Sequence, residues 1–172
     1  MDNTTAQLKV LVMGVGNTML QDDGIGVHVT ESLRSEAHAG RVVGDPDLEL
    51  VDGGTIGLSL LPDLEDAAAV IIVDASEIGE QPGTVRIFRD REIDQQLSGK
   101  QRTVHEVALA DLFAAAAIRG RSPARRALIA IQPGCTDWGL EPTPDVLAAI
   151  PGACAAVTNL ARQWQLEVSA DA

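Results

Sequence analysis

The hydrophobic pattern of this chain alternates short, continuous apolar runs with longer segments in which apolar residues recur every three or four positions. Short continuous apolar runs are typical of parallel strands that are buried on both faces. They predict strands over Lys9–Val15, Leu48–Val51, Ala69–Val73, Thr84–Phe88 and Ala127–Ile131. The other segments predict helices, the last one kinked or split by Pro151, over Gly26–Glu36, Leu58–Leu64, Val104–Ile118 and Pro144–Trp164.

Strands and helices that alternate along a chain are the signature of an α/β domain with a mainly parallel sheet. The length of 172 residues fits one domain, and the sequence contains no internal repeat and no linker. We therefore predict a single three-layer domain over residues 1–172, with a mostly parallel five-stranded sheet and helices on both faces. Residues 1–7 are expected to form a polar stub.

Charge and cysteine usage restrict the partners and the compartment. The net charge of −12 argues against nucleic acid or an anionic membrane as a partner, and an acidic surface disfavours self-association, so we expect a monomer. Cys135 and Cys154 have neither zinc-site nor disulfide-framework spacing, which indicates a reducing compartment. No signal peptide opens the chain, and the apolar stretches fall short of a membrane span. We expect a cytoplasmic protein.

The loop after the first predicted strand begins like a nucleotide-binding turn but departs from it. Gly14 and Gly16 allow a tight turn, yet the third glycine of a dinucleotide fingerprint is replaced by Met19. Asp22 and Asp23 then stand at the start of the helix, where their charges would repel a phosphate. This acidic pair favours a cation, and a nucleotide-binding α/β module is the weaker alternative.

Three residues are candidates for one site at the carboxyl edge of the sheet. Asp23 follows the first strand, Asp74 closes the run VIIVD, and His105 opens the segment TVHEVAL. Two carboxylates and an imidazole form a mixed oxygen and nitrogen site that suits zinc or nickel. We expect the three side chains to converge, with Asp23 and His105 at an open crevice rather than in the core. Each alone has an ordinary alternative: a helix N-cap for Asp74, a solvated helix start for His105, and first-turn helix acids for the pair at 22 and 23.

A glycine-rich block follows the second predicted strand. It reads Asp52, Gly53, Gly54, Thr55, and a further glycine stands at position 57. Glycines at this density suit close approach of the backbone to a ligand or a peptide. An ordinary turn between strand and helix is the alternative.

Five ordered blocks resemble the maturation endopeptidases of nickel–iron hydrogenases: GVGNTMLQDDGIGV, VDGGTIGLSLL, VIIVDA, PGTVRIF and VHEVALADL. The resemblance covers roughly Val10 to Leu160, which is nearly the whole chain. It implies that Asp23, Asp74 and His105 contact a metal and that the two aspartates are catalytic. It also implies contact with the precursor by the block from Asp52 to Thr55.

The resemblance further implies an endopeptidase, either aspartic-type or metal-assisted, that acts on one protein. Its substrate would be the hydrogenase large-subunit precursor, from which it removes a C-terminal extension after nickel insertion. The nickel would belong to the substrate and serve as the recognition element. Two rivals remain: a related peptidase of the same fold that acts on another precursor, such as a spore-protein protease, and a nickel-binding maturation chaperone without hydrolysis.

Overall fold

The computed structural model describes residues 8–38, 47–55, 57–98 and 104–170, so the expected stub at residues 1–7 lies outside the described part. Five strands form one sheet in the order β2-β1-β3-β5-β4. They are β1 (Lys9–Val15), β2 (Asp47–Gly54), β3 (Ala69–Ala75), β4 (Val85–Arg89) and β5 (Arg125–Ile131). All pair in parallel except β4, which lies antiparallel to β5 at one edge. The predicted sheet is confirmed.

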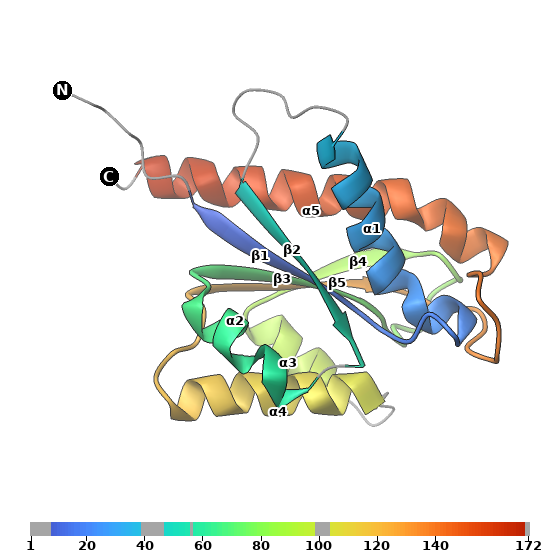
Figure 1. Cartoon of the computed structure of the whole chain (residues 1–172), viewed down its shortest axis with the longest axis horizontal. Coiled ribbons are helices and arrows are strands. Elements are labelled where there is room, and N and C mark those ends of the chain that lie inside the picture. Colours follow the sequence, from blue (N-terminus) through green and yellow to red (C-terminus); the bar gives the residue numbers. More distant parts are fainter. Residues whose placement is uncertain (1–7, 39–46, 56, 99–103, 171–172) are drawn as a thin grey trace.

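Helices cover both faces of the sheet, so the predicted three layers are confirmed (Figure 1). On one face lie α1 (Ile25–His38) and α5 (Pro144–Ala170). On the other lie α2 (Leu61–Asp66), α3 (Arg91–Leu97) and α4 (Val104–Ile118). Two short 3-10 turns, η1 (Gln21–Gly24) and η2 (Leu58–Leu60), lead into α1 and α2.

The strands divide the hydrophobic core into two halves, because successive residues of a strand point to opposite faces. In β1, Val10 and Val12 belong to the cluster that packs against α1 and α5. Leu11 and Met13 belong to the cluster that packs against α4. The central strands are therefore buried on both sides, which explains why their sequences are continuous apolar runs.

The sequence pattern missed α3. This helix has two buried side chains, Ile93 and Leu97, so its apolar periodicity extends over a single turn. It follows Asp90, whose φ of 47° reverses the chain after the edge strand β4. A helix this short is stabilised by its tertiary contacts rather than by its local sequence.

Of the two expectations for Pro151, the split is wrong, because α5 is continuous through this residue. Proline removes one backbone N–H, which in a helix would bond the carbonyl four residues earlier. That carbonyl belongs to Leu147, and both Leu147 and Pro151 are exposed, so water can replace the missing donor.

A second expectation about α5 also needs correction. This helix is long and apolar enough to cross a membrane by length and composition, although the sequence suggested that no stretch was. Its buried side chains include Val157, Leu160 and Trp164, which pack in the same core cluster as β1 and β3. The apolar character of α5 therefore serves the domain core.

The start of α1 lies in direct contact with the ends of two strands at Gly26. A Cβ atom added there would be 2.1 Å from the carbonyl oxygen of Val73 and 2.4 Å from that of Val15. Both obstacles are backbone atoms of buried central strands, which cannot move aside. Only glycine lets α1 sit this close to β1 and β3.

We expect Gly26→Ala to lower the free energy of unfolding by about 3 kcal/mol, because overpacking against fixed backbone forces α1 away from the sheet. Gly152→Ala is the matched control, since it is also a helical glycine but has no atom within 4 Å of an added Cβ. It should raise stability by about 0.5 to 1 kcal/mol. Urea unfolding of the two variants and the parent measures both values, and equal stabilities would contradict the close packing.

Candidate active site

The sheet order changes direction at the carboxyl ends of β1 and β3. The chain passes from β1 to β2 on one side and then to β3 on the other side of β1. Such a reversal is a topological switch point, where open α/β sheets bind their ligands. Asp23 follows β1, and Asp74 belongs to β3. The strand order therefore brings these two predicted site residues to the same edge of the sheet.

Asp23 lies in η1 and is 7% exposed. Its Oδ2 accepts a hydrogen bond of 2.9 Å from the backbone N–H of Asn17. Beneath it is Gly16, with a φ of 128°, where an added Cβ would lie 1.7 Å from the carbonyl oxygen of Asp23. The glycine turn thus holds Asp23 against the end of β1. The expected open setting is wrong for this residue, because the loop that presents it also covers it.

Asp74 is fully buried and lies opposite Ala130 of β5. The alternative role as a helix N-cap is wrong, because no helix follows it: β3 continues to Ala75, and the N–H of Ser76 then donates to Ile131 at 3.0 Å. The turn η1 contacts β3, and Gly26 touches the residue before Asp74. A fully buried aspartate is rare in proteins and usually has a specific role.

His105 lies in the first turn of α4, and its side chain is outside the described residues. Because α4 leads into the amino end of β5, the helix runs back along the sheet and begins toward the carboxyl edge (Figure 1). Among the described side chains, no group of three or more His, Cys, Asp and Glu is placed to hold a metal ion, and His105 is not among them. Convergence of the three candidate ligands stays a prediction.

Asp22 has a function that the sequence did not reveal. Its carboxylate is fully buried and accepts four hydrogen bonds from the loop after β5. The N–H groups of Gly134 and Cys135 each donate at 2.8 Å. Thr143 donates its N–H at 2.6 Å and its hydroxyl at 2.9 Å. The first residue of the acidic pair is therefore a clamp between two loops rather than a site for a cation.

Gln132 is a second positioning residue, at the end of β5. It is 6% exposed, and its Oε1 accepts the N–H of Ile78 at 2.9 Å. Its Nε2 donates to Glu77 Oε2 at 2.9 Å. Gln132 thereby fixes the segment that follows Asp74. The sequence signal for it was only a polar residue at the end of an apolar strand.

The glycine-rich block lies at the same edge of the sheet, as predicted. Gly53 is the extra residue where the pairing of β1 with β2 shifts register. The carbonyl of Gly54 accepts the N–H of Gly16 at 2.8 Å, and Asp52 Oδ1 accepts the N–H of Gly54 at 2.8 Å. Asp52 and Thr55 are exposed beside the loop that carries Asp23. Their contact with a precursor stays a prediction.

The cysteines do not form a disulfide, as expected. Burial raises the pKa of the Cys154 thiol, which makes this residue a poor nucleophile. Cys135 lies in the loop that Asp22 holds, and its Sγ is 3.6 Å from Asp137 Oδ2. Cys135 is therefore a loop residue.

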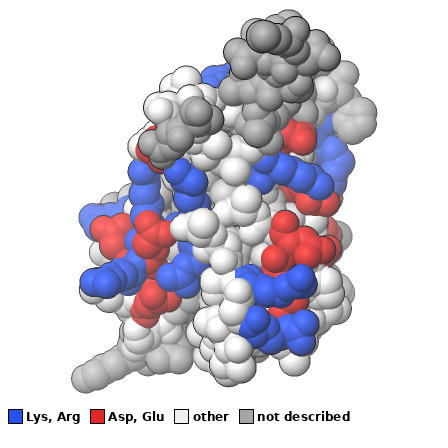
Figure 2. Space-filling view, turned by 90° about the vertical axis from the view of Figure 1, so that its left-hand side faces the viewer, with Lys and Arg blue, Asp and Glu red and all other residues white. Residues whose placement is uncertain are grey.

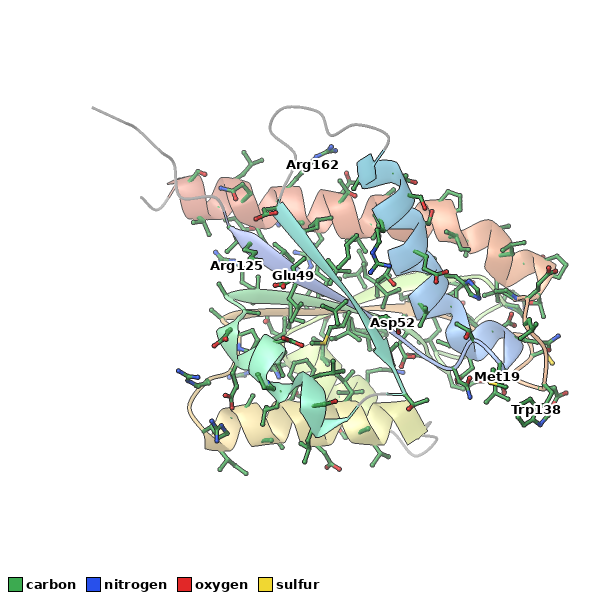
Figure 3. The ribbon with its side chains drawn as sticks, viewed as in Figure 1. Met19, Glu49, Asp52, Arg125, Trp138 and Arg162 are labelled. Carbon is green, nitrogen blue, oxygen red and sulfur yellow. The ribbon has the colours of Figure 1, made fainter. Side chains whose placement is uncertain are left out.

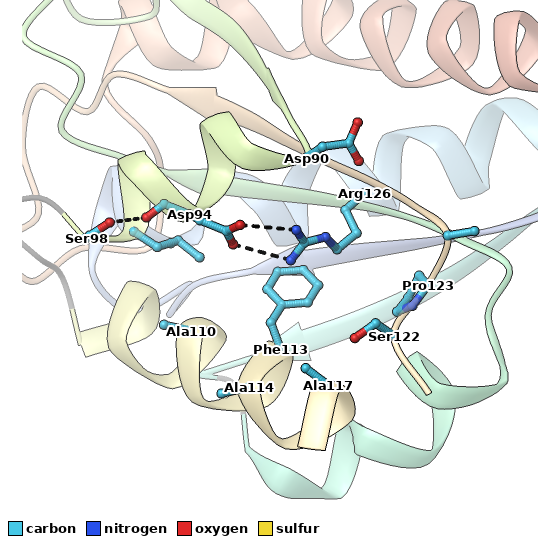
Figure 4. Close-up of a pocket in the computed structure, with 12 residues that line it drawn as sticks. Asp90, Asp94, Ser98, Ala110, Phe113, Ala114, Ala117, Ser122, Pro123 and Arg126 are labelled. Atoms are coloured by element: carbon cyan, nitrogen blue, oxygen red, sulfur yellow. Dashed lines mark hydrogen bonds and ion pairs between the residues drawn. The ribbon is translucent and has the colours of Figure 1, made fainter. Parts of the chain in front are cut away.

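A hollow of about 640 Å³ lies at the opposite edge of the sheet, between α3, α4 and the start of β5 (Figure 4). Arg126 crosses it, with two contacts of 3.3 Å to the Asp94 carboxylate and its guanidinium 5.1 Å from the centre of the Phe113 ring. The positive charge of Arg126 in this hollow is therefore already paired with the Asp94 carboxylate. The hollow is remote from Asp23 and Asp74, so cavity size does not mark the candidate site.

Charges are also paired at the end of the molecule where β1 and β5 begin. Figure 2 shows basic and acidic side chains interleaved on this face. The Glu49 carboxylate raises the pKa of Lys9, 2.9 Å away. Further ion pairs on the described surface include Arg121–Asp66 and Arg125–Glu167. Among the described residues on this face, the interleaving leaves no block of basic charge for an acidic partner.

Comparison with known proteins identifies the class. The sequence profile of the family described as hydrogenase maturation protease matches residues 27–160, which include Asp74 and His105 and begin after Asp23. The hydrogenase expression/formation protein HupD of Rhodobacter capsulatus is 37% identical over 162 residues, covering 94% of this chain and 75% of that protein. The hydrogenase 2 maturation protease of Escherichia coli K12 is 33% identical, covering 93% of this chain and 94% of that protein.

A solved structure agrees with these relatives. The hydrogenase maturating endopeptidase HybD from Escherichia coli superposes with a TM-score of 0.80 and 34% identity, covering 91% of this chain and 93% of that one. The fold is thus that of a maturation peptidase. This chain belongs to the hydrogenase maturation protease family.

We expect Asp22→Asn to lower the free energy of unfolding by about 2 to 3 kcal/mol, because an amide NH₂ would face N–H and O–H donors and leave hydrogen bonds of a charged acceptor unmade. Asp52→Asn is the control, since this exposed residue accepts one hydrogen bond that an amide oxygen can keep. Its effect should stay within about 0.5 kcal/mol. Urea unfolding compares them, and an equally small effect of both changes would disprove the clamp.

Proposed function

We propose that this protein is an endopeptidase that removes the C-terminal extension of a nickel–iron hydrogenase large-subunit precursor after nickel has been inserted. The observation that carries the proposal is a pair of buried aspartates, Asp23 and Asp74, at the switch point of a domain of the hydrogenase maturation protease family. The activity named for the Escherichia coli relatives supports peptide hydrolysis as the reaction.

The two aspartates supply the protein's part of the chemistry. Peptide hydrolysis requires a base to take a proton from water and an acid to protonate the leaving amine. Carboxylates perform both steps in turn when a site holds them beside the scissile bond. Their burial places them in a setting of low dielectric, where electrostatic effects on the reaction are larger than in water. Whether the site is aspartic-type or metal-assisted depends on which group polarises the carbonyl.

Nickel enters this proposal as part of the substrate. The donor set of Asp23, Asp74 and His105 offers two oxygens and one nitrogen, which suits a borderline divalent ion such as nickel. Three protein ligands leave coordination positions open for groups of the precursor, whose cysteine thiolates can present the metal. Bound there, nickel supplies Lewis-acid polarisation of the scissile carbonyl. Recognition of substrate nickel makes cleavage a checkpoint for metal insertion.

We place the enzyme in the cytoplasm as a monomer, without a nucleic acid or membrane partner. The net charge of −12 supports this proposal, because it opposes both anionic partners and self-association. The block from Asp52 to Thr55 borders the site and is proposed to contact the precursor. Asp52 and Thr55 are its exposed members.

Asp23→Asn and His105→Ala should each abolish processing of the precursor, because each removes a candidate ligand. In Asp23→Asn the amide oxygen can still accept the N–H of Asn17, so the free energy of unfolding should fall by only about 1 kcal/mol. Asp111→Asn is the control, on the exposed face of the helix that carries His105. The measurement combines a gel assay of precursor size with thermal unfolding. Full processing by either folded variant would remove that residue from the site.

Cleavage should require nickel on the substrate rather than on the enzyme. Metal-free enzyme is incubated with nickel-loaded and with nickel-free precursor, and only the loaded precursor should shorten. Equal trimming of both would overturn the checkpoint. Trimming of neither, with a folded enzyme and its own client, would favour the non-hydrolytic chaperone.

A further inference from the structure

Three large apolar side chains are exposed beside the candidate site. Met19 is 50% exposed, Trp138 77% and Leu140 73%. Figure 3 shows Met19 and Trp138 together at the end of the molecule where the loop after β1 turns toward α1. We call these three residues the apolar rim. They come from two loops that are more than a hundred residues apart in sequence, so their grouping is a product of the fold.

Backbone contacts hold the two loops of the rim together. Leu20 and Gly139 form a parallel bridge, in which the N–H of Gly139 donates to Met19 O at 3.0 Å and the N–H of Gln21 donates to Gly139 O at 2.9 Å. Gln21 has a φ of 45°, which is unfavourable for a residue with a side chain. An added Cβ at Gly139 would lie 2.6 Å from Gln21 Cγ, so the bridge also depends on glycine.

The same loops are tied to the candidate catalytic residue. The Asp22 clamp binds both ends of the loop that carries Trp138 and Leu140, at Gly134 and at Thr143. Asp22 is the neighbour of Asp23 in η1. The rim is therefore fixed relative to Asp23 before any partner binds, and a preorganised surface loses less conformational entropy on binding.

We propose that the apolar rim docks an apolar segment of the precursor next to the scissile bond, an inference that rests on the proposed function. Trp and Met are enriched at protein interfaces, and a central Trp often carries much of the binding energy. Exposed Asp137 and Glu141 flank Trp138 and Leu140 and form a polar border. The partner is the precursor because the rim is continuous with the site at which that protein is cut.

The kinetic test uses the double variant Trp138→Ser, Leu140→Ser and the control Ile118→Ser. Ile118 is 87% exposed, at the end of α4 that leads to the opposite edge of the sheet. In steady-state processing of nickel-loaded precursor, the double variant should raise KM about tenfold or more with kcat changed less than twofold. The control should match the parent. A fall in kcat with unchanged KM would overturn docking and indicate a disturbed site.

A binding test needs no variant. The chain has two tryptophans, exposed Trp138 and buried Trp164. Protein labelled with 5-fluorotryptophan should give two ¹⁹F signals. Unlabelled precursor should shift the Trp138 signal and protect it from solvent, while the Trp164 signal stays in place.

Processing of the precursor with an unchanged Trp138 signal would refute docking at the rim but not the proposed function. Absence of processing by the parent protein would refute the proposed function itself. A Trp138 signal already protected in free protein that sediments as a dimer would assign the rim to a second copy of this chain.

Discussion

Four hydrogen bonds converge on the carboxylate of Asp22, and all of their donors lie in the loop after β5. The Asp22 carboxylate that accepts them is fully buried. Hydrogen bonds to a carboxylate are shorter and stronger than hydrogen bonds between two neutral groups. The clamp fixes η1, and with it Asp23, against the loop after β5. The clamp thus joins the first and the last parts of the domain beside Asp23.

Close approach of backbones is the second constraint at this edge. At Gly16 and Gly26 an added Cβ would collide with the carbonyl oxygens of Asp23, Val15 and Val73. The loop after β1 and the start of α1 can therefore lie directly on the ends of β1 and β3. This closeness removes Asp23 from water, while Asp74 is buried within the sheet. A glycine turn that resembles a phosphate loop here serves to bury a carboxylate.

Two adjacent acids consequently have different functions. All the hydrogen bonds described for the Asp22 carboxylate go to the neighbouring loop, and the residue stabilises the fold. Asp23 accepts the backbone N–H of Asn17 and lies at the edge of the sheet where the strand order reverses. The clamp also holds Trp138 and Leu140 outward, although exposing large apolar side chains is unfavourable in water. The proposed docking at this border would join substrate binding to the position of Asp23.

The sequence by itself determined the class of fold and most of its elements, because continuous apolar runs and helical periodicity are local signals. The bounds of β1 and α4 agree with those predicted, and the placement of Asp23 and Asp74 at strand ends followed from their order along the chain. The family resemblance, which the comparisons confirm, also came from ordered motifs.

Only the tertiary structure decided that Asp22 is a clamp, that Asp23 is buried and that Met19 lies beside Trp138. The partners of Asp22 are 112 to 121 residues away, and no local pattern encodes a contact across that separation. Its burial and bonding depend on how the strands are ordered in the sheet.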